Sequence, residues 1–308
     1  MRKKSRLIAI VGPTASGKSE LAVQIAKKFK GEIISADSRQ IYQGLTIGTG
    51  KVPGRWRRGV FIYRGIAHYL IDEVSPRRQY NVGEFKREAE KWIKDITKRG
   101  KLPILAGGTA FWIDSVAYNL SIPEVPPNRS LRRKLAKRTL AQLLSYLRRL
   151  DPARAENIEK GNPRRLIRAI EIAKALGRVP KIKRHSPYDV LWIGIQRPAK
   201  KLRQRINRRL QTRLKNGMIE ELRRLRKQKL SWRRLNELGL EYRYLANYLQ
   251  GKMTKKEMIT ELESATWQYA RRQIGWWRRN PKIHWVRNAL QAEALLHGFS
   301  VPAKRSKK

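Results

Sequence analysis

The sequence has no cysteine and no grouping of histidines suited to a metal ion. None of its 308 residues is a cysteine, which excludes disulfides, thiolate zinc sites and cysteine nucleophiles. A chain without disulfides suits the reducing cytoplasm, where we expect this protein. The four histidines are scattered without the spacing of metal ligands: His68, His185, His284 and His297.

Long apolar runs are absent as well. Basic residues at the N-terminus are followed by Leu7–Val11, an order that resembles the start of a signal peptide. This run has only five residues and ends at Gly12-Pro13, so it is too short for the apolar core of a secretion signal. No stretch approaches the ~18–20 apolar residues of a membrane-spanning helix. We therefore expect no membrane partner.

Acidic residues are scarce. The chain has 24 Asp and Glu against 71 Lys and Arg, a formal net charge of +47. Charge of one sign at this density destabilises a compact protein by self-repulsion unless a polyanionic partner offsets it. Such a charge favours nucleic acid as the partner. A host whose proteins are all basic, or whose interior is salty, is the alternative that composition leaves open.

Four short apolar runs predict buried β-strands. They are residues 7–11, 32–36, 102–106 and 190–195. Helical patterns separate the first three runs, and strands that alternate with helices are typical of a parallel sheet in an α/β fold.

Two proline-rich breaks, at residues 121–128 and 180–187, enclose a basic stretch with helical periodicity. Because a strand pattern returns after the second break, this stretch is predicted to be an insertion between two strands of one sheet. The expected organisation is a catalytic core of residues 1–120 and 187–308 and an all-helical insertion domain of residues 121–186.

Beyond residue 199 the chain is expected to be nearly all helical. Thr254 is expected to cap one long helix, and apolar residues at i, i+4 spacing form a core-facing stripe: Leu202, Ile206, Leu210 and Leu214.

A complete Walker A pattern follows the first predicted strand and precedes a predicted helix. In that context its glycines let backbone N–H groups point at phosphate oxygens, at the positive end of the helix. Lys18 is expected to neutralise a terminal phosphate oxygen, and Ser19 to bind Mg²⁺. A nucleotide such as ATP is the usual ligand of such a loop. The predicted phosphate-binding residues are Gly12, Pro13, Thr14, Ala15, Ser16, Gly17, Lys18 and Ser19.

The second predicted strand leads into Asp37-Ser38-Arg39-Gln40. A carboxylate at the carboxyl end of a strand lies where ligands of such sheets bind, so Asp37 is a candidate general base. A helix-capping role for Asp37 or Ser38 is equally compatible with the sequence. Gly107-Gly108-Thr109 follows the third strand and permits close backbone approach to a ligand, or simply makes a tight turn.

His68–Glu73 imitates a Walker B strand, with Asp72 on Mg²⁺ and Glu73 activating water. This alternative makes the chain a nucleic-acid-dependent ATPase. Such enzymes usually need a second domain or ring partners and an arginine finger, which a single core with an inserted helical arm does not resemble. A structural role for both acids in a loop is as plausible as the ATPase role.

Together these segments resemble the tRNA dimethylallyltransferases, also called tRNA isopentenyltransferases. Only the first of the family's signatures is widespread elsewhere, and the combination, found over residues 6–286, is specific. Five signatures occur in family order: Gly12–Ser19, Asp37–Tyr42, Ile47–Pro53, Pro103–Thr109 and Trp267–Trp277. Two further segments also resemble the family: Asn162–Glu171 and Arg205–Glu221.

The resemblance implies a P-loop NTPase-like core and transfer of a dimethylallyl group from dimethylallyl diphosphate, with Mg²⁺ as cofactor. The acceptor in the family is the exocyclic amine of the adenosine on the 3′ side of the anticodon, and diphosphate is released. By resemblance, Asp37 is the general base and Thr14 contacts the oxygen that bridges carbon and phosphorus. An arginine of the helix over Arg205–Arg213 shares that contact, with Arg209 the best match and Arg205 second.

By resemblance, the acceptor is tRNA. Prenyl transfer to a free adenine nucleotide is a nearby alternative, but the large positive charge favours tRNA. The chain is expected to be of the bacterial type, because it lacks the cysteines of the zinc finger found in many eukaryotic members. It is also expected to be a monomer. Two positions and one segment depart from the usual family pattern: Gly50, Trp112 and Leu238–Arg243. The implied tRNA contacts are Asp37, Ser38, Arg39, Gln40, Thr109, Arg164, Arg165 and Arg168. For the last three a solvated basic face is the alternative, and tRNA contact is the favoured interpretation.

Overall fold

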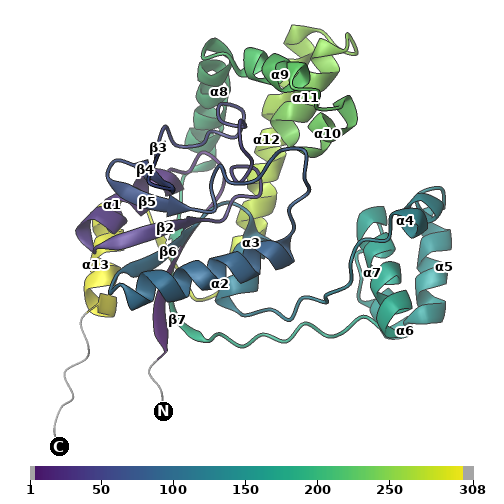
Figure 1. The fold of residues 1–308 in the computed structure, drawn as a ribbon, viewed down its shortest axis with the longest axis horizontal. Helices are drawn as coiled ribbons and strands as arrows, with labels where there is room; N and C mark the ends of the chain where they lie inside the picture. Colours follow the sequence, from purple (N-terminus) through teal and green to yellow (C-terminus); the bar gives the residue numbers. More distant parts are fainter. Residues whose placement is uncertain (1–3, 301–308) are drawn as a thin grey trace, which may run out of the picture. The chain divides into compact units, whose positions relative to one another are not determined.

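A computed structural model describes residues 4–300 of the chain. It divides into two compact units, one within Met1–Asn119 and Ser186–Lys308 and the other over Leu120–His185. The larger unit is built on a β-sheet, and the smaller unit contains helices only (Figure 1).

The sheet of the larger unit has eight strands in the order β3-β4-β5-β2-β6-β1-β7-β8. All neighbours from β5 to β8 in this order are parallel, whereas β3, β4 and β5 form antiparallel pairs. The α/β class with a mostly parallel sheet is therefore confirmed, and so are the four predicted strands. The strands are β1 (Ser5–Val11), β2 (Gly31–Ser35), β3 (Arg55–Arg57), β4 (Val60–Tyr63), β5 (Ile66–Tyr69), β6 (Leu102–Ala106), β7 (Tyr188–Ile195) and β8 (Ile283–Val286).

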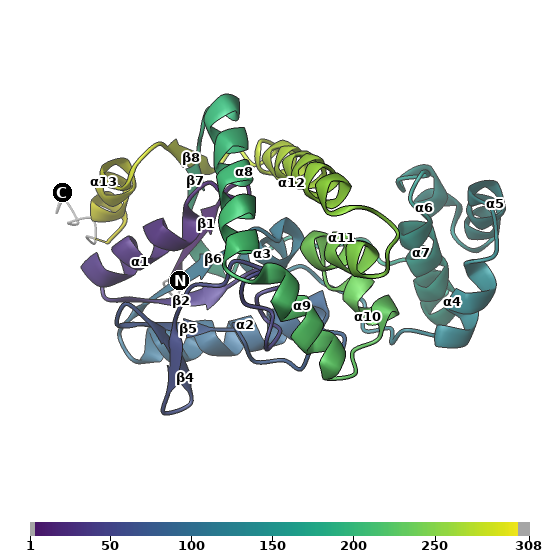
Figure 2. The same cartoon turned by 90° about the horizontal axis from the view of Figure 1, so that it is seen from above.

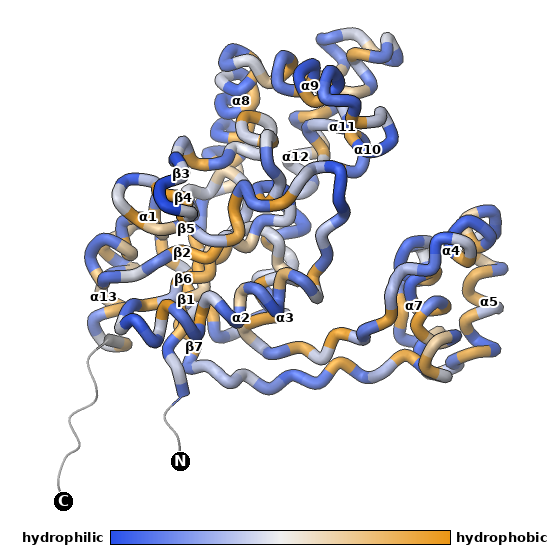
Figure 3. Tube along the Cα trace, in the orientation of Figure 1, coloured by the Kyte–Doolittle hydropathy of each residue, from blue (hydrophilic) through white to orange (hydrophobic). Residues whose placement is uncertain are grey.

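Helices cover both faces of the sheet because successive side chains of a strand point to opposite faces. In β1, Leu7 and Ala9 belong to one buried apolar cluster, and Ile8 and Ile10 belong to another. Helices α1 (Lys18–Lys28) and α13 (Ala289–Ser300) pack on the Ile8 side, and α2 (Val82–Lys98) and α3 (Ala110–Ala117) on the Leu7 side. Figure 3 shows β1 and β6 as mostly hydrophobic and the covering helices as a mixture of hydrophilic and hydrophobic residues.

Five helices lie between β7 and β8 in the chain and stand together beside the sheet (Figure 2). The predicted stripe on α8 is confirmed, because three of its residues are buried and Leu214 is partly buried. Thr254 caps α12 as predicted, and it forms a capping box with Glu257. These helices are α8 (Ala199–Lys215), α9 (Met218–Lys227), α10 (Trp232–Glu237), α11 (Leu240–Leu249) and α12 (Lys255–Trp277).

Two parts of the sheet were not predicted. The expectation that the chain is nearly all helical beyond residue 199 is wrong at β8, which pairs in parallel with β7. The antiparallel β3-β4-β5 edge was also missed, and there β5 pairs in parallel with β2. These strands have only three or four residues each, too few to show a clear apolar alternation.

The smaller unit has its own apolar core, which includes Leu143, Leu147, Leu166 and Ile170. Its buried carboxylate, Glu171, forms ion pairs with Arg132 and Arg168 on the same unit. The unit consists of α4 (Arg129–Leu135), α5 (Leu140–Leu150), α6 (Pro152–Glu156) and α7 (Pro163–Leu176). Across the described residues of both units, no helix is sufficiently long and apolar to cross a membrane.

Candidate active site

The Walker A segment forms a tight loop between β1 and α1. Gly12 and Gly17 have φ of 141° and 107°, values that residues with a Cβ rarely adopt. A Cβ on Gly12 would also lie 3.1 Å from the carbonyl oxygen of Ile195. Lys18 Nζ donates to the Pro13 carbonyl at 2.7 Å, so the ammonium folds back over its own loop. The loop presents its amides at the positive N-terminus of α1, an arrangement suited to an anion.

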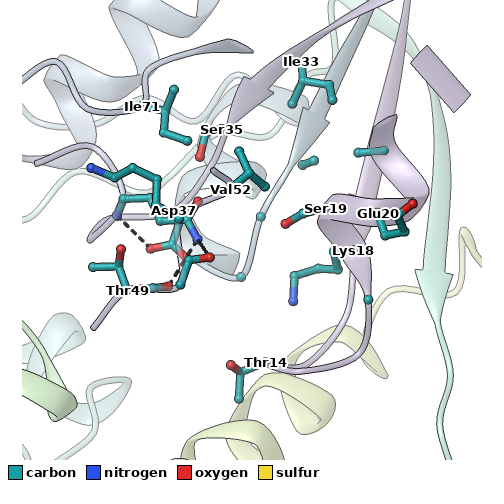
Figure 4. Close-up of a pocket in the computed structure, with 18 of the residues that line it drawn as sticks. Thr14, Lys18, Ser19, Glu20, Ile33, Ser35, Asp37, Thr49, Val52 and Ile71 are labelled. Atoms are coloured by element: carbon teal, nitrogen blue, oxygen red, sulfur yellow. Dashed lines mark hydrogen bonds between the residues drawn. The ribbon is translucent and has the colours of Figure 1, made fainter. Parts of the chain in front are cut away.

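A pocket of about 330 Å³ opens beside this loop. Figure 4 shows Asp37 and Thr49 on one side of the pocket, Lys18 and Ser19 on the other, and Thr14 below them. Two arginines of α8, Arg205 and Arg209, also line it. Of the eight predicted phosphate-binding residues, five line the pocket and three do not. Those that do not are Gly12, Pro13 and Ser16.

Lys18 is electrostatically unusual. Burial lowers the pKa of its ammonium to about 7, the charge of Asp37 opposes this shift, and Arg209 adds to it. Burial and neighbouring arginines likewise lower the pKa of Arg209 to about 10. The pocket therefore gathers cations that repel one another and that a bound polyanion would stabilise.

Asp37 accepts hydrogen bonds through one oxygen only. Its Oδ1 accepts from the Arg39 and Gln40 amides at 2.9 and 3.3 Å, which caps the turn after β2. Its Oδ2 makes no hydrogen bond within residues 4–300, so it is free to accept a proton from a ligand. The structure is thus compatible with both roles considered for Asp37, since one oxygen suffices for the cap.

The glycine turn after β6 lies against the Asp37 segment. A Cβ on Gly107 would come within 2.1 Å of the Ala36 carbonyl oxygen, so the backbones approach too closely for any other residue. Thr109 Oγ1 accepts from the Ser38 amide at 3.0 Å. Of the residues implied to contact tRNA, Asp37–Gln40 and Thr109 therefore lie together. Arg164, Arg165 and Arg168 lie on α7 of the smaller unit.

Asp72 and Glu73 lie outside the pocket lining. Asp72 pairs with Lys51 and accepts from Trp56 Nε1. Glu73 accepts from the Leu70 amide at 2.7 Å, and burial raises the pKa of its carboxyl. Asp72 is engaged with the segment that carries Lys51 and Trp56, and Glu73 with its own loop. Neither acid lines the pocket, so the geometry gives no support to the ATPase alternative.

The chain matches known proteins over most of its length. The family model described as IPP transferase matches residues 40–280, and a model described as isopentenyl transferase matches residues 5–55. A tRNA dimethylallyltransferase 1 of Geotalea daltonii is 41% identical over 297 residues, which is 94% of each chain. The chain belongs to the tRNA dimethylallyltransferase family. A second family member, from Anoxybacillus flavithermus, is 38% identical over 91% of this chain and 89% of its own length.

Solved structures of dimethylallyltransferases share the fold. The crystal structure of a tRNA isopentenylpyrophosphate transferase from Bacillus halodurans aligns with a TM-score of 0.71 and 32% identity over 96% of both chains. A eukaryotic dimethylallyltransferase, solved acting on tRNA, aligns with a TM-score of 0.74 and 25% identity over 96% of this chain and 77% of its own.

Three side chains brace the phosphate loop, and of these the sequence had indicated Arg205 as a candidate but neither Arg197 nor Gln273. Arg205 Nε donates to the Ala15 carbonyl at 2.7 Å, and Arg197 Nε to the Ser16 carbonyl at 3.2 Å, so both brace the phosphate loop. Gln273 also contacts this loop. It lies inside the tRNA dimethylallyltransferase signature over residues 267–277, which was the only signal that could have found it.

The two candidate arginines of α8 differ in their contacts. Arg205 is engaged with the phosphate loop. Arg209 lines the pocket and makes no hydrogen bond or ion pair with another described residue. Its guanidinium is therefore the more available of the two for a ligand, and its contact with the diphosphate stays a prediction.

Proposed function

We propose that this protein transfers a dimethylallyl group from dimethylallyl diphosphate to the exocyclic amine of the adenosine 3′-adjacent to the anticodon of tRNA. One observation carries the proposal: Asp37 and the phosphate loop face each other across one pocket. The loop suits a diphosphate and the carboxylate suits a base, so both ends of a displacement have a matching group. The family's name supports the same reaction.

The leaving group would lie on the phosphate loop. Lys18 and Arg209 would face the diphosphate oxygens, on which negative charge develops as the carbon–oxygen bond breaks. The Thr14 hydroxyl makes no hydrogen bond to a described residue, so it is free to donate to the bridging oxygen. Gly12, Pro13 and Ser16 would act through the shape of the loop, because they do not line the pocket.

The Ser19 hydroxyl fits Mg²⁺ as a hard oxygen ligand at the pocket wall. Within residues 4–300 no three acidic or histidine side chains gather as a metal site. Mg²⁺ that serves phosphates commonly takes few protein ligands and completes its shell with phosphate oxygens and water. When bound, the ion would help to neutralise the charge that develops on the diphosphate.

Asp37 would act as the general base. As the adenine nitrogen attacks the allylic carbon, a nitrogen–carbon bond forms and the carbon–oxygen bond to diphosphate breaks. The proton lost by the amine passes to Oδ2, the oxygen that does not cap the turn. The adenosine must leave its stack to reach the pocket, which costs a few kcal/mol and less in a single-stranded loop.

The tRNA would contact both units. Asp37–Gln40 and Thr109 lie at the pocket, and the smaller unit would contact the anticodon arm through α7. On that helix Arg164 and Arg165 are exposed, whereas Arg168 is engaged with Glu171 and with the Val125 carbonyl. Action as a monomer in the cytoplasm stays a prediction, as does the domain role of the insertion.

The proposal is tested by following label from dimethylallyl diphosphate with Mg²⁺ present. The acceptors are tRNA and AMP in separate reactions, and ATP hydrolysis is measured with and without tRNA. Label in tRNA at the adenosine next to the anticodon is the expected result. Label in AMP alone, or ATP hydrolysis without any prenyl transfer, would overturn the proposal.

A further inference from the structure

A single glutamine of α12 bridges two loops of the pocket. Gln273 Oε1 accepts from the Thr14 amide at 2.8 Å, and its Nε2 donates to the Gly108 carbonyl at 2.8 Å. Thr14 belongs to the phosphate loop after β1, and Gly108 to the glycine turn after β6. The glutamine is only 5% exposed. A buried amide with both bonding groups satisfied holds both loops to the same helix.

The chemistry of this bridge calls for an amide. One end must accept from an N–H and the other must donate to a carbonyl, and both come from one side chain. A carboxylate at position 273 would place a second acceptor against the Gly108 carbonyl and bury a charge. Gly108 also makes room for the bridge, because a Cβ there would lie 2.7 Å from Gln273 Nε2.

The bridge continues from the glycine turn to Asp37. Thr109 follows Gly108 directly, and its Oγ1 accepts from the Ser38 amide at 3.0 Å and lies 3.3 Å from the Ser38 hydroxyl. Ser38 is the neighbour of Asp37 in the chain. A continuous path of covalent and hydrogen bonds thus links the phosphate loop to the candidate base through the glutamine side chain.

The two loops carry the groups at opposite ends of the proposed displacement. Thr14 would contact the departing oxygen, and Asp37 would take the proton of the attacking amine. Their separation decides whether both can act on one substrate pair in line. A misplacement of about 1 Å between such groups typically costs on the order of 100-fold in rate.

We propose that Gln273 is a positioning residue that fixes Thr14 and Asp37 at the separation the transfer requires. This inference rests on the proposed function, since only that reaction uses both groups together. Gln273 does not line the pocket. It acts through the two loops it joins and not by contact with substrate.

The test compares two substitutions on α12. Gln273→Met removes both hydrogen bonds and keeps the length of the side chain. Trp276→Phe is the matched control, because it removes a bond from the same helix, Trp276 Nε1 to Asp114 Oδ2 at 2.9 Å, and leaves both loops untouched. The readouts are the single-turnover rate of prenyl transfer at saturating substrates, the KM for tRNA, and the thermal midpoint.

Gln273→Met is expected to lose about 10–100-fold in transfer rate, while its KM for tRNA stays within about twofold of the unmodified protein. Trp276→Phe is expected to keep its transfer rate even where its thermal midpoint falls as far. A transfer rate unchanged in Gln273→Met, or lowered only as far as in Trp276→Phe, would overturn the inference.

Gln273→Glu adds a readout that a merely structural role would not move. The charged carboxylate keeps an acceptor for Thr14 but has no donor for Gly108, whereas the protonated acid regains one. The ratio of its transfer rate to that of the unmodified protein is therefore expected to rise as pH falls. A flat ratio, or the loss of the folded state in both variants of Gln273, would contradict a positioning role. An unmodified protein that transfers nothing to tRNA would instead contradict the proposed function.

Discussion

At the scale of single residues, the ammonium of Lys18 loses its proton more readily in the free protein than an ordinary lysine does. Burial lowers the pKa of its ammonium to about 7, so well above that pH the free protein carries a neutral amine there. A bound diphosphate favours the charged form and raises this pKa again. Binding above about pH 7 must then take up a proton, whereas below it the proton is already present.

Proton uptake should therefore accompany diphosphate binding at about pH 8 and fade at about pH 6. Calorimetry of diphosphate binding in buffers of different ionisation enthalpy measures this uptake directly. Lys18→Met is the control, since it removes the titrating group and leaves the protons of the ligand itself. Equal uptake by this variant and by the unmodified protein at pH 8 would show that Lys18 stays charged when free.

The neighbours of Gly50 explain why a glycine stands at this position. Its φ is 61°, and a Cβ there would lie 2.7 Å from Arg209 Nη2 and closer still to Arg213. The two guanidinium groups occupy the space that an alanine would need. In this chain the missing side chain allows Arg209 to stand in the pocket.

Gly50→Ala is expected to displace Arg209 and to raise the KM for dimethylallyl diphosphate by about tenfold or more. Such a factor corresponds to the loss of one charge-assisted hydrogen bond. Gly65→Ala is the matched control: its φ is 79° but nothing lies within 4 Å of its Cβ, so it shares only the backbone strain. Equal KM values for the two variants would show that Arg209 is not displaced.

The residues of the site were predictable where one short segment carries the chemistry. The phosphate loop and Asp37 are local patterns next to a strand end, so the sequence alone indicated them. Gln273 and Arg197 act on loops 259 and 181 residues away in the chain. Periodicity and local motifs do not report such contacts, which the folded topology creates.

At the scale of elements, one acid of α9 holds the pocket loop between β2 and β3. Glu221 accepts from three successive amides, those of Thr46, Ile47 and Gly48, at 2.6–3.0 Å. It also accepts from the Tyr242 hydroxyl at 2.7 Å. The carboxylate is buried, so these donors have no water to replace it.

Glu221→Gln should destabilise the protein by about 2–3 kcal/mol, because the amide presents its own donors to the same N–H groups. A fall of the thermal midpoint by about 5 °C or more is expected. Glu220→Gln on the same helix is the control, since Glu220 is exposed and pairs only with nearby Arg223. Similar midpoints for the two variants would show that the carboxylate does not hold the loop.

Elements with long, regular patterns were predicted well and short edge strands were not. β1 and β6 are buried on both faces and therefore appear as unbroken apolar runs. β3 is exposed at all three residues, and β8 is buried only at Ile283 and Val286. Their strand state follows from pairing with a neighbour, which the local sequence does not encode.

At the scale of the whole molecule, the net charge of +47 is the property most directly tied to the proposed partner. Neutralising tRNA phosphates with Lys and Arg releases counterions, so the affinity should fall linearly on a log–log plot against salt. A loss on the order of 10³-fold between ~50 and ~200 mM salt is expected if about six phosphates are contacted. A flat salt response would assign the basic surface to another cause.

One exposed arginine of the smaller unit sharpens this test. Arg164→Ala should lower the salt slope by about one, because Arg164 is exposed on α7 without an ion pair to a described residue. Lys91→Ala is the control, since Lys91 lies on α2 of the larger unit and pairs with Glu88. The same slope for both variants would remove the evidence that α7 contacts tRNA.

The measurement closest to the central claim is the single-turnover transfer of dimethylallyl to tRNA by the unmodified protein and by Asp37→Asn. The asparagine keeps an oxygen that can cap the turn after β2, but it cannot take the proton of the amine. The account predicts prenylated adenosine beside the anticodon, with the rate lowered at least about 100-fold in the variant and with tRNA affinity unchanged. Equal rates for the two proteins would contradict it.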